Sequence, residues 1–563
     1  MSQHFGKWAG NWRMSAVAAL LLIAAAGSVV AQQAAPAPDK PQASPRDDSQ
    51  DKAAGKGKQQ TRITPEQAKQ LFSLVDELIK FSSQETGLPI KSDVKRQLTS
   101  RNTVEAYLKE KFDEDESAKR MQRDEIVLKK FGMLDRDFSL KPFLLALLKE
   151  QIEAYYDSKT KTVNMLDWVD VDEQKPVLAH ELTHALQDQH ADLDKWNDQT
   201  PNDVSVNANQ DTDHLAKDEI DTAREAVAEG QATAVMMDYI LKPMGKSLVK
   251  DPEVMDAVKQ QMSGSENSPV LARAPLMLSE SLLFPYREGL SFEQDIWMDK
   301  GQKAAFAGAL DRPPTSSWEI INPREYENRH LPSVPLLPDI HPLVDPVYRP
   351  YDIGQMGQLD LHILAEVFGG DNAARDLTPA WDGGVYWAGQ RLSAKSPAEL
   401  GSTKSISLFY LSAWKNASSA QAFAALYVDA LGRKYSGLKA ELAVQRPATL
   451  STGALEPESQ EQIFSSDEGP IVITTRGRLV FVSESFDLEM ARKLASLILD
   501  AQGTGEMQQA LAAPPTAAPM NLEPESRESL TGGLSRFISG CGVMKAVVDA
   551  ELRNGAATRG IRP

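Results

Sequence analysis

The sequence predicts an α+β fold in which a mainly helical domain with a small β-hairpin sheet is followed by a smaller α+β domain. Apolar residues recur at helical spacing from residue 64 to about 148, and again over 214–241. β-hairpin patterns occur at 155–166 and at 471–482, each with a polar or glycine-containing turn. Prolines are dense from 312 to 350, which is typical of an extended crossing between domains.

Composition limits the classes of function. The chain has 563 residues, of which 42% are hydrophobic, so it can bury more than one core. The formal net charge of −18 repels phosphate backbones and anionic lipid, so we expect neither nucleic acid nor a membrane surface as a partner. The single cysteine, Cys541, allows no intrachain disulfide, and any metal site must use His, Asp and Glu.

The N-terminus is typical of an export signal at residues 1–31. Lys7 and Arg13 precede a short alanine-rich apolar run, and a small-residue cleavage site ends at Ala31. An uncleaved membrane anchor is the alternative, although the run is short for a membrane span. Residues 32–62 then form an expected disordered linker, rich in Ala, Pro, Gln, Asp and Lys. We expect the mature protein in the periplasm or outside the cell.

The remaining chain divides into two expected domains and a tail. The first domain spans 63–345 and begins with a helix whose Thr64-Pro65 start combines an N-cap with proline at N1. The second spans 351–503 and carries no catalytic constellation, and 504–563 form a C-terminal tail. The elements expected in the second domain are a helix at 353–368, a strand at 405–411, a helix at 418–432, the hairpin at 471–482 and a helix at 487–499.

The most informative segment is a buried helix predicted over about 171–190. It contains the pattern H-E-x-x-H, running from His180 through Glu181 to His184. Histidines four residues apart lie on one face of a helix, where both imidazoles can hold one zinc ion, and Glu181 can reach a metal-bound water. The alternative is a pair of structural histidines that bind no metal.

A catalytic zinc site usually has a third protein ligand. His190 has the spacing found in metzincins, but Gln187 replaces the glycine that turns the chain in those proteins. An unbroken helix would leave His190 about 120° away from the zinc-facing side. Glu229 is the stronger candidate, because small neighbours such as Gly230 would let its helix approach the motif helix closely.

Glu225 stays open as an alternative to Glu229. It lies one turn earlier on the same face, where it could be the ligand or could orient a histidine. The ligand types suit other divalent metals too, but the glutamate adjacent to the first histidine favours zinc, Zn²⁺, as a single ion.

These motifs resemble a known group of enzymes. The HELTH run at 180–184 with EGQA at 229–232 resembles the gluzincin zinc metallopeptidases. The longer run HELTHALQDQ, the later EGQAT and the segment FPYREG at 284–289 are similar to a set of secreted bacterial zincin-like proteins. The resemblance covers about residues 150–330. It implies a zincin-like fold for 63–345 and zinc ligation by His180, His184 and Glu229.

The resemblance implies an exported zinc-dependent metalloendopeptidase that acts on protein or peptide substrates. A zinc-bound water would attack the peptide carbonyl with Glu181 as general base, and Tyr286 or Arg287 would donate a hydrogen bond to the developing oxyanion. The alternative for Tyr286 is a packed core tyrosine. The strand at 162–166 would be the sheet edge that holds an extended peptide. The alternatives are a non-catalytic zincin-fold protein for binding or assembly in the envelope, and a zinc hydrolase acting on a non-peptide amide such as a cell-wall cross-link.

Overall fold

Helix α1 (Pro65–Thr86) begins at the predicted position in this computed structural model of the chain. The Thr64 side chain accepts a hydrogen bond from the backbone of Gln67, and the Gln67 side chain accepts one from the backbone of Thr64. This reciprocal capping satisfies two backbone donors that the first helical turn leaves without partners. The helix ends at Gly87, whose φ of 70° favours glycine.

The structure describes residues 63–113, 115–197, 199, 201, 204–251, 255, 268–446 and 459–502. The predicted export signal, linker and C-terminal tail lie outside the described residues, so they stay predictions. Among the described helices, none combines the length and apolar character that a membrane span requires.

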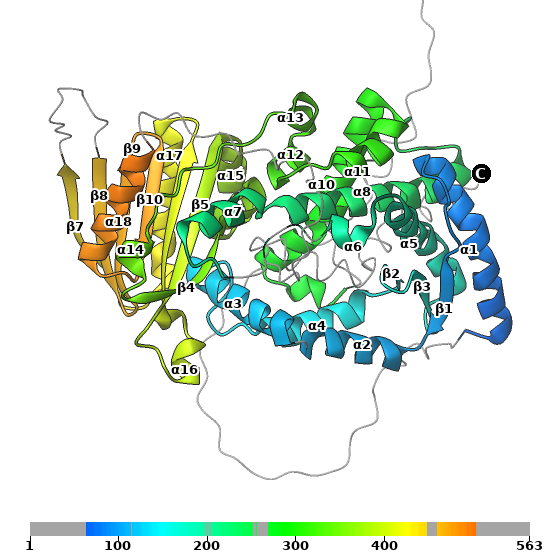
Figure 1. The fold of residues 1–563 in the computed structure, drawn as a ribbon, viewed down its shortest axis with the longest axis horizontal. Helices are drawn as coiled ribbons and strands as arrows, with labels where there is room; N and C mark the ends of the chain where they lie inside the picture. The colour runs from blue at the N-terminus through cyan, green and yellow to red at the C-terminus, as the bar shows by residue number, and fades with distance from the viewer. Residues whose placement is uncertain are drawn as a thin grey trace, which may run out of the picture. The chain divides into compact units, whose positions relative to one another are not determined.

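The N-terminal part of the described chain is mainly helical (Figure 1). Its longer helices after α1 are α2 (Arg101–Asp113), α3 (Asp115–Phe131), α4 (Leu140–Gln151), α5 (Val171–Ala191), α7 (Ala208–Lys217), α8 (Ile220–Leu241) and α10 (Leu276–Lys300). Its short helices are α6 (Leu193–Trp196), η1 (Lys242–Met244), η2 (Leu271–Arg273), η3 (Ala304–Gly308), α11 (Ala309–Asp311), α12 (Ser317–Ile321), α13 (Pro323–Asn328) and α14 (His341–Val344).

A three-stranded sheet lies within this helical part. Its strands are β1 (Lys95–Thr99), β2 (Ala154–Asp157) and β3 (Thr162–Leu166). The β2–β3 hairpin is antiparallel as predicted, whereas β1 lies inside a segment that we predicted to be helical. The strand order β1-β3-β2 places β3 in the centre, so the prediction that β3 is the edge strand was wrong. The reason is β1, which pairs in parallel with the side of β3 that the hairpin leaves open.

The C-terminal part is built on a seven-stranded antiparallel sheet in the order β4-β5-β6-β10-β9-β8-β7. Its strands are β4 (Tyr348–Gln355), β5 (Trp381–Arg391), β6 (Ile406–Trp414), β7 (Lys439–Arg446), β8 (Ser459–Ser466), β9 (Gly469–Arg476) and β10 (Leu479–Glu484). Its helices are α15 (Gln358–Leu377), α16 (Pro397–Leu400), α17 (Ala417–Lys434) and α18 (Leu488–Ala501), with the short η4 (Thr378–Ala380) and η5 (Thr403–Ser405). The helix predicted at 353–368 therefore starts later, because residues through Gln355 complete β4. The predicted α+β class is confirmed.

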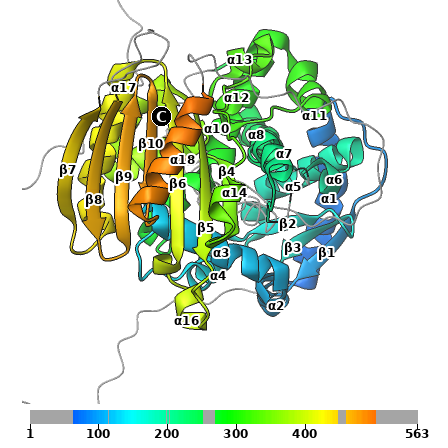
Figure 2. The ribbon, with the colours of Figure 1, turned by 60° about the vertical axis from the view of Figure 1, so that its left-hand side comes forward.

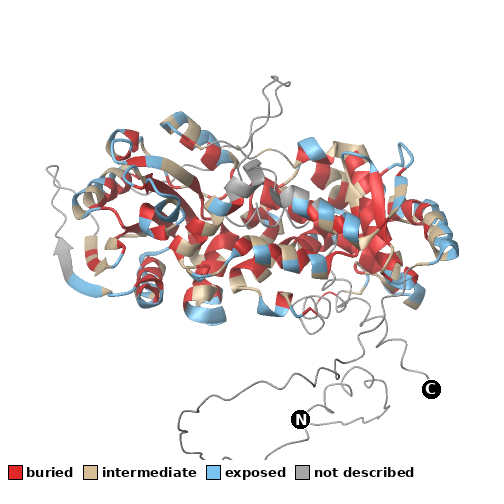
Figure 3. Cartoon of the chain, turned by 90° about the horizontal axis from the view of Figure 1, so that it is seen from below, coloured by how far each residue is buried: buried red, intermediate tan, exposed pale blue. Residues whose placement is uncertain are grey.

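Side chains that alternate along the strands separate two apolar cores. On β6, Phe409 and Leu411 pack with α18, whereas Leu408 and Tyr410 belong to the core that includes α15 and α17. Figure 2 shows α18 crossing one face of the sheet. That larger core continues into the N-terminal helices, and buried residues follow the inward faces of the elements throughout (Figure 3).

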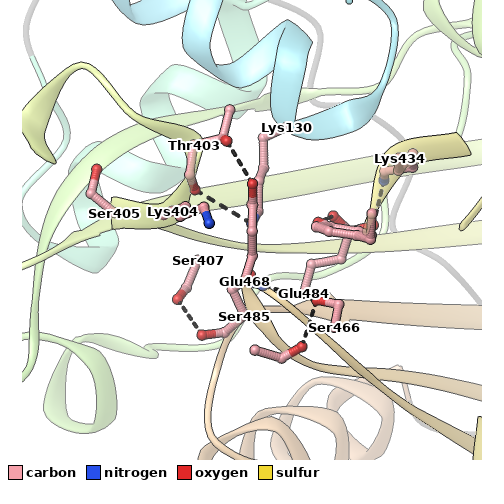
Figure 4. A network of polar contacts seen from close by, with 12 residues as sticks. Lys130, Thr403, Lys404, Ser405, Ser407, Lys434, Ser466, Glu468, Glu484 and Ser485 are labelled. Atoms are coloured by element: carbon pink, nitrogen blue, oxygen red, sulfur yellow. Dashed lines mark hydrogen bonds and ion pairs between the residues drawn. The ribbon is translucent and has the colours of Figure 1, made fainter. Parts of the chain in front are cut away.

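A buried ionic network joins α3 to the sheet (Figure 4). Lys130 on α3 is fully buried, and its ammonium group contacts Glu468 at 2.8 Å and the Ser485 hydroxyl at 2.6 Å. Burial lowers the pKa of Lys130 to about 8, although the negative charge of Glu468 opposes the shift. Lys434 forms a second buried pair with Glu484. Removing one partner of either pair would leave a buried charge unpaired, which is strongly destabilising.

Candidate metal centre

Helix α5 carries the H-E-x-x-H motif through the interior of the helical part. The Asp170 side chain caps its start by accepting a hydrogen bond from the backbone of Asp172 at 2.8 Å. Val177, Leu182 and Leu186 are fully buried along the helix. The polar side chains between them therefore need partners inside the protein.

The structure brings His180, His184 and Glu229 together. The Nε2 atoms of His180 and His184 lie 3.0 Å apart. One carboxylate oxygen of Glu229 lies 3.1 Å from Nε2 of His180, and the other lies 3.5 Å from Nε2 of His184. His180 is fully buried, while the His184 side chain keeps 13% of its surface exposed. These three residues could hold a metal ion, since one ligand atom from each lies within 4.8 Å of the others.

The donor set fits a cation. Burial raises the pKa of Glu229, but the two histidines outweigh that effect and hold it at about 2. Burial lowers the pKa of His184, but the Glu229 carboxylate outweighs that effect and raises it to about 9. Both shifts arise from the close contact between the histidines and the Glu229 carboxylate. Two imidazole nitrogens and one carboxylate are also the ligand set of gluzincin-type zinc sites.

The other candidate ligands lie elsewhere. Glu225 is buried on α8, but it does not belong to the group of three that could hold a metal. His190 contacts Asp311 at 2.8 Å and does not belong to that group either. Of the two glutamates that the sequence leaves open, the structure therefore places Glu229 against the histidines.

Glu181 lies beside these histidines and next to the small sheet. It is 1% exposed, and its Oε2 accepts a 2.7 Å hydrogen bond from the backbone N–H of Tyr156 on β2. The Tyr156 hydroxyl donates to Asp188, two turns further along α5, at 2.7 Å. Strand β2 is thus bound to the motif helix at both points, and its outer edge faces Glu181.

The structure separates the two candidate oxyanion donors. The Tyr286 ring on α10 stacks against the His180 ring, with centroids 6.3 Å apart and an interplanar angle of 24°. Arg287 instead pairs with Glu280 at 2.6 Å and with Glu288 at 3.1 Å, both on its own helix. Tyr286 is therefore the member of this pair that lies at the site.

Two glycines allow the helices around the site to cross closely. A Cβ atom at Gly230 would lie 2.2 Å from the backbone of Gly289, and one at Gly289 would lie 2.0 Å from the carbonyl oxygen of Ala226. Gly230 thus faces α10, which corrects the expectation that it lets α8 approach α5. The crossing brings Tyr286, one turn before Gly289, close to the helix that carries Glu229.

Neither a protein-family model, nor a curated protein, nor a solved structure matches the chain. The chemistry of the described residues therefore carries the functional proposal.

The sequence did not predict a role at the site for several residues. Gln187 binds His184 and Asp188 anchors β2, at three and four residues after His184. This spacing on a helix was an available signal, because side chains three or four positions apart share a face. Tyr156 acts through its backbone N–H, for which a side-chain pattern gives no signal.

Glu293 on α10 is expected to limit stability at neutral pH. Burial raises its pKa well above the usual 4.5, and the Gln231 amide only opposes that rise. The unfolded chain loses this proton above pH 4.5 while the folded protein keeps it, so stability falls as pH rises between the two pKa values. Glu293→Gln should raise the free energy of unfolding, and the gain should be larger at pH 7 than at pH 5. Urea unfolding at both pH values measures this, and an equal gain at both would contradict it.

Proposed function

We propose that the chain is an exported zinc-dependent endopeptidase of the zincin type. The observation that carries the proposal is the convergence of His180, His184 and Glu229, with Glu181 adjacent and bound to an edge strand. A zinc ion bound there supplies a Lewis acid that polarises the scissile carbonyl and acidifies water. Two histidines, one carboxylate and a neighbouring glutamate base suit this hydrolysis better than they suit redox chemistry.

The residues around the metal ligands divide the remaining work. Glu181 takes a proton from the attacking water and delivers it to the leaving amine. The Tyr156 N–H holds one oxygen of that carboxylate, which fixes its orientation. The Tyr286 hydroxyl donates a hydrogen bond to the oxygen on which negative charge develops.

Strand β2, rather than β3, is the proposed docking edge for substrate. It is the outer strand of the small sheet and lies beside Glu181. An extended peptide that added to this edge would bind through backbone groups other than the Tyr156 N–H, which Glu181 accepts, so recognition would depend weakly on side chains. Substrates of this kind are unfolded proteins or flexible peptides.

The test is proteolysis by protein that lacks residues 1–31. We expect cleavage of an unstructured protein substrate, loss of cleavage after chelation, and recovery when zinc is added back. Failure to cleave together with failure to bind zinc would reject the proposal. Cleavage of peptidoglycan fragments but not of unfolded protein would point instead to a cell-wall amide as substrate.

A further inference from the structure

Two buried glutamines form a hydrogen-bonded chain behind His184. The His184 Nδ1 atom lies 2.8 Å from Oε1 of Gln187. The Gln187 Nε2 atom donates to Oε1 of Gln231 at 2.9 Å and to the Ala228 carbonyl at 3.0 Å. The Gln231 Nε2 atom donates in turn to backbone carbonyls of η3, at Ala305 (2.9 Å) and Phe306 (3.0 Å). Both glutamine side chains are fully buried.

The backbone carbonyls of Ala305 and Phe306 determine which group donates in every hydrogen bond of this series. A carbonyl oxygen only accepts, so the Gln231 side chain must turn its amide nitrogen toward η3 and its oxygen toward Gln187. Gln187 must then turn its nitrogen toward Gln231 and the Ala228 carbonyl. Its own oxygen is left facing His184 and can only accept, so His184 must carry a proton on Nδ1.

We propose that Gln187 and Gln231 are positioning residues that fix His184 in its Nδ1–H tautomer and present its Nε2 lone pair to the metal. This inference rests on the proposed metal site and extends it to residues that do not touch the ion. A histidine ligand commonly donates its second ring N–H to a partner that sets both the tautomer and the ring orientation. Here the partner is a neutral amide that is itself held by a second amide.

The hydrogen bonds of the two glutamines also connect the two helices that carry the ligands. Gln187 lies one turn after His184 on α5, and Gln231 lies two residues after Glu229 on α8. Their mutual hydrogen bond, together with the Gln187 bond to the Ala228 carbonyl, ties α5 to α8 beside the site. The anchor, η3, is a single π-helical turn, and its Ala305 and Phe306 carbonyls accept from Gln231 of another helix.

The test measures zinc affinity by competition with a chelator, with no need for peptidase activity. Gln187→Leu and Gln231→Leu should each weaken zinc binding, and Gln187→Leu should do so by about 10- to 100-fold. Gln187→Glu keeps an acceptor for the Nδ1 proton but cannot donate to Gln231 and the Ala228 carbonyl, so it should restore affinity only in part. Gln189→Ala is the matched control, because this glutamine lies on the same helix but binds the backbone of Lys91 and Ser92 at the surface. Wild-type affinity in a folded Gln187→Leu protein would overturn the proposal.

Nitrogen-15 NMR of the zinc-loaded wild type measures directly which ring nitrogen of His184 carries the proton. This measurement tests the proposal even if the leucine variants fail to fold. We expect the ring proton of His184 on Nδ1, and a proton on Nε2 would overturn the proposal. If the wild type binds no zinc, the proposed function fails, yet the hydrogen-bonded chain can still be tested in metal-free protein. The side-chain amide protons of Gln187 and Gln231 should then exchange slowly with solvent, and rapid exchange would overturn the inference.

Discussion

Glu181→Gln is expected to lower kcat/KM for an unstructured peptide by about 10²- to 10⁴-fold while zinc content stays at the wild-type level. Glutamine keeps the shape of the side chain and can still accept the N–H of Tyr156, so the fold around the site should not change. It cannot accept a proton from water, so the general base is lost. The measurement is steady-state peptidase kinetics with elemental analysis of the same samples.

Glu173→Gln is the control for this variant. Glu173 lies on the same helix, α5, but is exposed in its first turn, so its loss should leave kinetics and zinc content unchanged. Full activity in Glu181→Gln would remove the general base from the account. A biological function that survives Glu181→Ala, in a protein that still binds metal, would favour a zincin-fold protein whose role is binding or assembly.

Gly289→Ala is expected to destabilise the protein by about 3 kcal/mol or more and to reduce its zinc content. The added methyl carbon would lie 2.0 Å from the Ala226 carbonyl oxygen, so α8 and α10 would have to separate. Backbone cannot move aside as a flexible side chain can. Because α8 carries Glu229, the separation should also displace this ligand from the two histidines.

The control for Gly289→Ala is Gly432→Ala. Gly432 lies inside α17, and a Cβ atom there would meet nothing within 4 Å. Alanine favours a helix over glycine, so this variant should be as stable as the wild type or more stable, by up to about 1 kcal/mol. Chemical denaturation measures both variants. Equal stability of Gly289→Ala and the wild type would contradict the close crossing of α8 and α10.

The features that the sequence predicted well are those that depend on short-range helix geometry. The four-residue spacing of His180 and His184 places them on one face of any helix, and the Thr64 cap acts within a single turn. Glu229 could be singled out because small residues surround it. The choice between Glu229 and Glu225 needed the packing of α8 against α5, which no local pattern contains.

The features that were missed depend on contacts between distant segments. Strand β1 has the sequence KRQLT, whose charged and polar residues give no apolar alternation, and it forms because β3 offers an open edge. That pairing is also why β3 became the central strand. The Gln187–Gln231 bond joins residues 44 positions apart, so it appears only once α5 and α8 are packed together.

Zinc content by elemental analysis of protein lacking residues 1–31 tests the central claim most directly, with Glu229→Ala and Glu225→Ala prepared in parallel. We expect one zinc per chain in the wild type and in Glu225→Ala, and its loss in Glu229→Ala, because Glu229 joins the two histidines in the group that could hold a metal. A wild type that neither carries zinc nor can be loaded with it would contradict the account. Zinc retained in Glu229→Ala and lost in Glu225→Ala would contradict the assignment of the third ligand.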